Sequence, residues 1–149
     1  MTRWLGIDHG TRRMGMAVAD SLTAIASPLS QLPAQPLEQC LRQILVAAAD
    51  YSADGIVVGW PLNDDGSEGP QANLARQFAL QLAGRTTLPV RLWDEHLSSF
   101  AADQKLRGLY TRKQKKQRHD SLAAAAFLED FLRVGGPFSA PLAQEVKPG

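Results

Sequence analysis

The first twenty residues constrain the fold more than any other stretch of the chain. An apolar run over 4–7 ends in the carboxylate of Asp8, and a second apolar run ends in Asp20. Between them, residues 10–13 form a turn rich in glycine, hydroxyl and guanidinium groups, so the pattern predicts a β-hairpin. Gly6 lies inside the first strand, where glycine is typical of a close approach by another backbone or a ligand. A carboxylate at a strand end beside such a turn suits a metal ion and a phosphate group.

The rest of the pattern predicts a mixed sheet covered by helices. A short apolar stretch over 24–32 adds a third antiparallel strand, and the later segments alternate between helical spacing and continuous apolar runs. Such alternation is typical of βα units in a parallel sheet. We therefore expect an α/β protein with a five-stranded mixed sheet, three antiparallel strands followed by two parallel ones, flanked by helices. After the hairpin and third strand, the expected elements are helix 37–52, strand 55–59, a helix from 69 closed by Gly84, strand 88–93, a helix from Ser98 or Ser99 to Leu109, and helix 120–133.

The length of 149 residues favours one domain, which we expect over residues 1–136. Three prolines and few apolar residues after that point predict a flexible C-terminal tail over 137–149. No apolar run approaches the ~20 residues of a membrane span, and charged residues interrupt the start where a signal peptide needs an apolar core. The single cysteine, Cys40, leaves no internal disulfide. We expect a cytoplasmic protein without a membrane partner.

Positive charge is concentrated in one segment, which predicts a contact with a polyanion. Residues 104–119 carry seven of the sixteen basic residues and no acid, which leaves nine basic against fifteen acidic residues elsewhere. A solvated, mobile loop is the alternative interpretation of such a run. Phosphate contacts by Lys and Arg supply affinity without reading sequence. The nucleic-acid-binding residues expected here are Arg112, Lys113, Lys115, Lys116 and Arg118.

Three acids that are far apart in the sequence can meet at one edge of the predicted sheet. Asp8 and Glu95 (or Asp94) end strands that are expected to be parallel, and Asp120 begins the last expected helix. Ligands of open α/β sheets gather beyond the carboxyl ends of the parallel strands. Three carboxylates repel one another unless a cation holds them, and oxygen ligands suit Mg²⁺ or Mn²⁺. A pair of such ions is typical of phosphodiester hydrolysis.

Each acid also has an ordinary structural interpretation. Asp120 could be the N-cap of its helix. Asp94 or Glu95 could end a strand and enter a turn, and Asp20 could cap the hairpin. Three histidines adjoin candidate acids, but neighbours in a strand point to opposite faces, so adjacency does not make them ligands.

The chain resembles the YqgF/RuvX family in four segments that occur in the same order and at similar spacing. They read GIDHGTRRMGMAVAD, VVGWPLNDDGSEG, DEHLSS and HDSLAAAAFLEDFL, and the resemblance covers about residues 3–133. It implies the RNase H-like fold and the activity of proteins described as Holliday junction resolvases or pre-16S rRNA nucleases. It implies three catalytic, metal-holding carboxylates: Asp8, Glu95 and Asp120. It also implies that two loops face the substrate, the turn with Thr11, Arg12 and Arg13 and the loop with Asn63.

The third motif departs from the family pattern. The family usually has Asp-Glu-Arg followed by threonine, whereas this chain has His96 after Glu95 and keeps a hydroxyl at Ser98. Histidine titrates near neutral pH, unlike arginine. If that arginine holds phosphate in the family, we expect weaker activity or a preference for lower pH.

These features predict a metal-dependent nuclease that acts on structured nucleic acid, with maturation of the 5′ end of 16S rRNA in ribosome biogenesis as the favoured role. One alternative is the same chemistry on branched DNA, as in a Holliday junction resolvase of recombination and repair. Another is a non-catalytic nucleic-acid-binding module. A sugar-kinase or actin-like ATPase shares the GIDHGT loop, but the remaining length cannot supply its second domain. The oligomeric state stays open between monomer and homodimer.

Overall fold

A mixed sheet with the strand order β3-β2-β1-β5-β6 forms the centre of the protein. The computed structural model describes residues 1–94 and 112–146, and for 112–120 it describes the backbone alone. The hairpin of β1 and β2 is antiparallel, and β5 and β6 continue the sheet parallel to β1, which confirms the expected arrangement. The strands are β1 (Arg3–Asp8), β2 (Arg13–Asp20), β3 (Ser27–Pro28), β4 (Leu32–Pro33), β5 (Gly55–Gly59) and β6 (Val90–Trp93).

The segment expected as one third strand forms two short ones. β3 and β4 both pair antiparallel with β2, at different points along it. Pro28 and Pro33 end these two strands and lack the N–H that a longer ladder needs, which explains why each pairing spans two residues. The antiparallel side of the sheet is therefore present, but its outer strand is interrupted.

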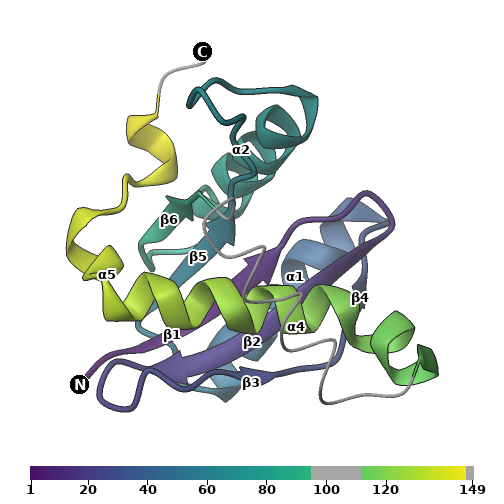
Figure 1. Cartoon of the computed structure of the whole chain (residues 1–149), viewed down its shortest axis with the longest axis horizontal. Coiled ribbons are helices and arrows are strands. Elements are labelled where there is room, and N and C mark those ends of the chain that lie inside the picture. Colours follow the sequence, from purple (N-terminus) through teal and green to yellow (C-terminus); the bar gives the residue numbers. More distant parts are fainter. Residues whose placement is uncertain (95–111, 147–149) are drawn as a thin grey trace.

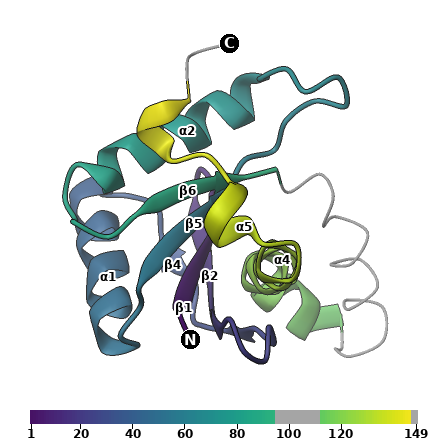
Figure 2. The ribbon, with the colours of Figure 1, turned by 90° about the vertical axis from the view of Figure 1, so that its left-hand side faces the viewer.

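Helices cover both faces of the sheet. Figure 2 shows α1 and α2 on one side of the strands and α4 and α5 on the other. The first two helices agree with the sequence pattern, and Pro70 occupies the first turn of α2, where its missing N–H is not needed. The bounds are α1 (Leu37–Asp50), α2 (Pro70–Ala83), α4 (Arg112–Arg133), α5 (Gly136–Ser139) and the 3₁₀ helix η2 (Ala143–Glu145).

The last long helix begins earlier than the sequence pattern suggested. α4 starts at Arg112, so Asp120 lies about 12 Å along the helix and is not its N-cap. The reason is the composition of residues 112–118, because Lys, Arg and Gln favour helices and no Gly or Pro interrupts them. The basic residues therefore continue directly into the helix that carries Asp120. The helix expected from Ser98 or Ser99 lies outside the described residues.

The side chains of β1 alternate between two apolar cores. Leu5 and Ile7 are fully buried with residues of α1 and α2. Trp4 belongs to the second core, where its ring meets Phe131 of α4 edge to face at 5.1 Å. α4 crosses β1 and β2 on this side (Figure 1). The alternation fixes which face each residue of β1 presents, including the acid at its end.

The C-terminal segment packs on the sheet where we expected a loose tail from residue 137. The amide of Leu92 donates a hydrogen bond of 2.9 Å to the carbonyl of Pro141, and Leu142 forms a bridge with Arg91. Ala143 is fully buried. Prolines suggested disorder, but small alanines let this segment lie close against the edge strand β6. Within the described residues, no helix is long and apolar enough to cross a membrane.

Candidate functional site

Three parallel strands end at one edge of the sheet and bring their following residues together. Ile7 pairs with Val58, and Gly59 pairs with Trp93. The residues that follow, Asp8, Trp60 and Asp94, therefore lie at neighbouring positions along this edge. The amide of Trp60 donates a hydrogen bond of 2.7 Å to the carbonyl of Trp93, which ties the second strand end to the third. We call this part of the sheet the carboxyl edge.

Asp8 faces the α4 side of the sheet. It continues the alternation of Trp4 and Gly6, both of which contact α4. The next residue, His9, turns to the opposite face, where its ring lies 5.2 Å from the ring of Phe78 in α2. Burial lowers the pKa of His9 below its ordinary value. Of these two adjacent residues, the carboxylate and not the imidazole lies on the α4 side.

α4 runs antiparallel to β1, and this register brings Asp120 toward Asp8. Phe131 packs on Trp4 at the start of β1, and Leu128 and Ala124 lie over Gly6 further along it. Two further strand residues advance about 6.6 Å, and one further helical turn advances about 5.4 Å. From Gly6, the advance along the strand leads to Asp8. From Ala124, the advance of one turn toward the start of the helix leads to Asp120, four residues earlier. The fold thus places the Asp120 position on the helix stripe that covers the end of β1.

Glu95 lies outside the described residues, as do His96 and Ser98. Asp94, its direct neighbour, is the last described residue after β6. Among the described residues, no group of three His, Cys, Asp or Glu side chains could hold a metal ion. Glu95 and the side chain of Asp120 are not among the described groups, so the set of three acids remains a prediction. The donors that do reach the carboxyl edge are carboxylates, which fit Mg²⁺ or Mn²⁺ better than zinc.

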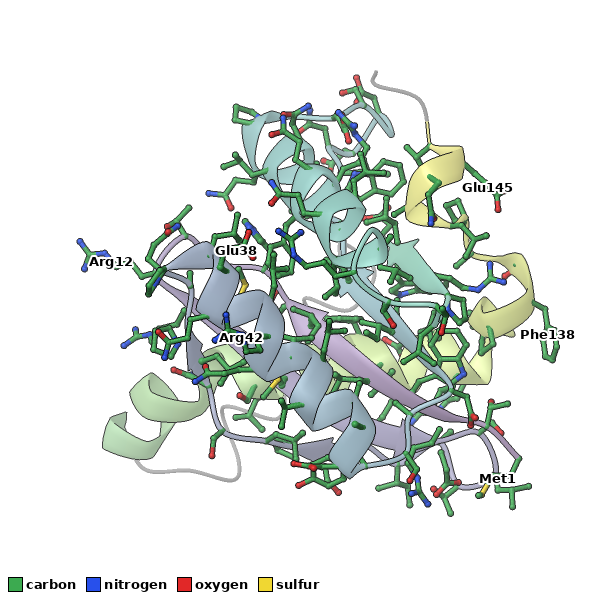
Figure 3. All side chains as sticks on the ribbon, turned by 180° about the vertical axis from the view of Figure 1, so that it is seen from behind. Met1, Arg12, Glu38, Arg42, Phe138 and Glu145 are labelled. Atoms are coloured by element: carbon green, nitrogen blue, oxygen red, sulfur yellow. The ribbon has the colours of Figure 1, made fainter. Side chains whose placement is uncertain are left out.

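The hairpin turn beside Asp8 is held in one conformation. A Cβ added at Gly10 would lie 2.2 Å from the carbonyl oxygen of Arg13, so this turn requires glycine. The carbonyl of Arg12 accepts a hydrogen bond of 2.8 Å from the amide of Ala34. Thr11, Arg12 and Arg13 are exposed, and Figure 3 shows Arg12 extending away from the body of the protein. Their side chains are therefore available to a ligand at this end of the sheet.

The loop after β5 closes its own tip. The amide of Asn63 donates to the carbonyl of Ser67 at 2.9 Å, and its side-chain amide donates to the Ser67 hydroxyl at 3.0 Å. The Ser67 hydroxyl and amide both donate to the Asp65 carboxylate, and these bonds lower the pKa of Asp65. Asn63, expected to face substrate, thus belongs to a small structured turn that leaves the sheet beside Asp8.

A buried carboxylate that the sequence pattern did not predict lies at the base of this loop. Glu68 accepts hydrogen bonds from Arg76 Nε at 2.8 Å and from Trp60 Nε1 at 3.0 Å. Burial opposes ionisation of Glu68, but these bonds and the Arg76 charge outweigh it and lower its pKa. A signal was present in the sequence, because Arg76 is the one charged residue among the buried, otherwise apolar residues of α2, which include Ala72, Ala75 and Ala79.

The basic residues predicted to bind nucleic acid lie at the start of α4. Arg112, Lys113, Lys115, Lys116 and Arg118 all belong to its first two turns, and the same helix carries Asp120. Their backbone positions are described, and their contacts stay a prediction. A helix therefore connects these five basic residues to the third predicted acid.

Comparison with known proteins gives a match over most of the chain. A family model described as "RuvX: Holliday junction resolvase" matches residues 2–134. A protein of Chloroflexus aggregans is 41% identical over 86% of this chain and 91% of its own length. One of Anaeromyxobacter sp. (strain K) is 44% identical over 91% of this chain and 99% of its own length. Both carry the name "Putative pre-16S rRNA nuclease".

Solved structures with the same fold include two resolvases. Thermus thermophilus RuvC, in complex with a Holliday junction substrate, has a TM-score of 0.62 at 17% identity and covers 95% of this chain and 100% of its own. The fowlpox virus resolvase, in complex with Holliday junction DNA, has a TM-score of 0.52 at 11% identity and covers 89% and 97%. At these identities the likeness shows the fold, which is RNase H-like as the sequence motifs implied.

Proposed function

The chain belongs to the RuvX family, and on this premise we propose that it is a metal-dependent nuclease that processes the 5′ end of pre-16S rRNA. Membership of this family, together with the names of its relatives, identifies the chain as a phosphodiester hydrolase. The observation that carries the proposal is the position of Asp8, which ends a buried strand on the side that α4 covers. The antiparallel register of α4 brings Asp120 to the same end.

The catalytic residues of the proposal are Asp8, Glu95 and Asp120. Their carboxylates would hold Mg²⁺ or Mn²⁺, and Glu95 comes in the sequence directly after Asp94, the last described residue at the carboxyl edge. When bound, such ions activate water and stabilise the charge of the leaving oxygen. The chain would contribute a fixed frame, because Trp4 and Gly6 of β1, the strand that carries Asp8, pack against α4, the helix that carries Asp120.

The substrate-binding residues of the proposal come from three segments of the chain. Thr11, Arg12 and Arg13 are exposed on the hairpin turn, and Asn63 belongs to the neighbouring loop. The basic start of α4 adds Arg112, Lys113, Lys115, Lys116 and Arg118. Contacts from these groups to phosphates would supply affinity that falls with salt and carries little sequence information.

RNA is the proposed substrate because relatives more than 40% identical are named for it. The second candidate is the four-way DNA junction, which the family description and both resolvase structures favour. The chemistry would be the same for both, so only a direct comparison of substrates separates them.

The experiment compares three proteins on two substrates. Wild type, Asp8→Asn and Asp20→Asn are each incubated with a precursor 16S rRNA fragment and with a four-way DNA junction, with Mg²⁺, with Mn²⁺ or with EDTA. Asp20→Asn is the matched control, because Asp20 ends the other strand of the hairpin and accepts hydrogen bonds from Leu22 and Thr23. We expect metal-dependent cleavage of the RNA by wild type and Asp20→Asn and none by Asp8→Asn.

Each other outcome assigns the function differently. Equal cleavage by Asp8→Asn and wild type would contradict the catalytic assignment. Cleavage of the junction alone would select the DNA candidate. Salt-sensitive binding of both nucleic acids with no turnover by any of the three proteins would identify a non-catalytic binding module.

A further inference from the structure

A buried ion pair between Glu68 and Arg76 lies at the base of the loop after β5, where the first and last parts of the loop meet. The Arg76 side chain is 6% exposed and that of Glu68 is 5% exposed, so both charges are removed from water. The Glu68 carboxylate also accepts from the Trp60 indole at 3.0 Å and from Asn73 Nδ2 at 3.5 Å. One carboxylate therefore holds the residue directly after β5 and two residues of α2.

The loop consists of a fixed base and a separately closed tip. Trp60 forms the base, where its amide also binds the carbonyl of Trp93 on β6. The tip, residues 63–67, is closed by the hydrogen bonds between Asn63 and Ser67. The hydrogen bonds within the tip set its shape but not its place relative to the sheet. Its place relative to Asp8 therefore depends on Trp60 and on Glu68.

The fold itself has another source of stability in this region. Phe78, Ala79 and Leu82 of α2 are buried in the core formed with β5 and β6. Two well-packed apolar side chains can replace a buried ion pair with little or no loss of stability. A network of four polar side chains at the base of a loop beside the carboxyl edge is therefore better explained by positioning than by folding.

We propose that Glu68 and Arg76 are positioning residues that fix the loop of residues 60–67 beside Asp8 for substrate binding. Neither residue touches the reacting atoms. They act through Trp60, whose indole and amide join the loop base to Glu68 and to β6. The inference rests on the proposed nuclease function, because substrate affinity is the property that the loop serves.

The test removes the ion pair without leaving a buried charge. The variant Glu68→Met/Arg76→Met replaces both side chains by apolar ones of similar length. Its matched control is Glu38→Met/Arg85→Met, because Glu38 and Arg85 also form an ion pair, but one that is 66% and 37% exposed and joins α1 to the end of α2. Urea unfolding, steady-state kinetics on the cleaved nucleic acid and hydrogen exchange of the Trp60 indole N–H are measured for both.

The positioning role predicts a loss of affinity in a folded protein. KM of Glu68→Met/Arg76→Met rises about tenfold or more while kcat stays within about twofold of wild type, because a misplaced binding loop weakens ground-state and transition-state binding alike. The Trp60 indole exchanges faster by about tenfold or more as its acceptor is lost. The control variant retains wild-type KM and exchange. An unchanged KM in a folded double variant would overturn the proposal.

A second variant keeps the test decisive if the double variant does not fold. Trp60→Phe removes the indole donor, keeps an aromatic ring of smaller size, and leaves both members of the Glu68–Arg76 pair in the chain. A raised KM with unchanged kcat supports the proposal, and wild-type KM overturns it. If wild type cleaves neither substrate, the proposed function fails by itself. The indole exchange and the affinity for the uncleaved nucleic acid then test the positioning role: unchanged values in the double variant overturn it.

Discussion

Gly6 of β1 lies directly beneath Leu128 of α4. A Cβ added at Gly6 would meet the Cβ of Leu128 at 3.3 Å and the carbonyl oxygen of Ala124 at 3.5 Å. The absence of a side chain therefore sets how closely the helix approaches the sheet. Asp8 comes two residues after Gly6, and Asp120 comes four residues before Ala124. We therefore expect the same spacing to affect the distance between these two predicted acids.

Gly6→Ala should reduce cleavage more than its effect on stability explains. The added methyl requires α4 to move by a few tenths of an ångström, and such overpacking costs about 1–3 kcal/mol. The shift also moves Asp120 relative to Asp8, so we expect kcat to fall under conditions where the protein is fully folded. Gly84→Ala is the control, since its added Cβ makes only ordinary contacts at the end of α2. Wild-type kcat in Gly6→Ala would contradict this coupling.

Phe131→Ala should be among the most destabilising substitutions in α4. Phe131 is fully buried, and its ring lies 5.1 Å from Trp4 and 5.7 Å from Trp93, both edge to face. Loss of such a side chain costs about 3–5 kcal/mol of unfolding free energy. Phe138→Ala is the matched control, because Phe138 is 93% exposed and projects from the surface in Figure 3. Urea unfolding of both variants checks the contrast, and equal losses would refute it.

Acid should remove the stability that the Glu68–Arg76 pair contributes. Burial opposes ionisation, but the bonds from Arg76 and Trp60 prevail, so the folded-state pKa of Glu68 lies below its ordinary 4.5. As pH falls, the unfolded state binds the proton first, so this contribution is complete above the ordinary pKa and disappears as pH falls through the folded-state pKa. The difference in unfolding free energy between wild type and Glu68→Met/Arg76→Met should stay constant from about pH 7 to 5 and shift against wild type below about 4.5. If the difference in unfolding free energy between the two proteins stayed constant below pH 4.5 as well, the pH dependence would not come from Glu68.

Ala143→Asp should destabilise the C-terminal segment and expose the edge strand β6. Ala143 is fully buried in the segment that packs on α2 and β6, and an unpaired carboxylate there cannot be solvated. We expect a loss of several kcal/mol, as is usual for an unpaired buried charge. Gln144→Asp introduces the same group at the exposed neighbouring position and should change stability by about 0.5 kcal/mol or less. Similar unfolding curves for the two variants would show that the segment is not part of the packed domain.

The sequence predicted the elements whose patterns are local. The continuous apolar run Gly55–Gly59 is a strand buried on both faces, and α1 and α2 follow their apolar spacing. The position of Asp8 at the end of a buried strand was also predictable, because the run and its terminal acid are adjacent. The strand order then follows from the hairpin and the parallel crossovers.

The features that were not predicted depend on partners distant in sequence. The charge run before Asp120 left the early start of α4 undecided, because its composition suits a helix and also a solvated loop. The C-terminal prolines indicated a loose tail, and only packing against α2 and β6 explains why Ala143 is buried. Glu68 comes just before α2 and Arg76 lies within it, so their pairing depends on the path by which the loop enters the helix. Glu95 lies outside the described residues, so its place in the site stays a prediction.

Manganese binding tests the central claim most directly, because it reports on the acids without requiring the correct substrate. Free Mn²⁺ is measured by electron paramagnetic resonance during titration of wild type, Asp8→Asn and the control Asp20→Asn. We predict saturable binding by wild type and Asp20→Asn, and a loss of affinity of about tenfold or more in Asp8→Asn because one carboxylate ligand is removed. Equal Mn²⁺ affinity in Asp8→Asn and wild type would contradict the assignment of Asp8 as the metal-holding residue.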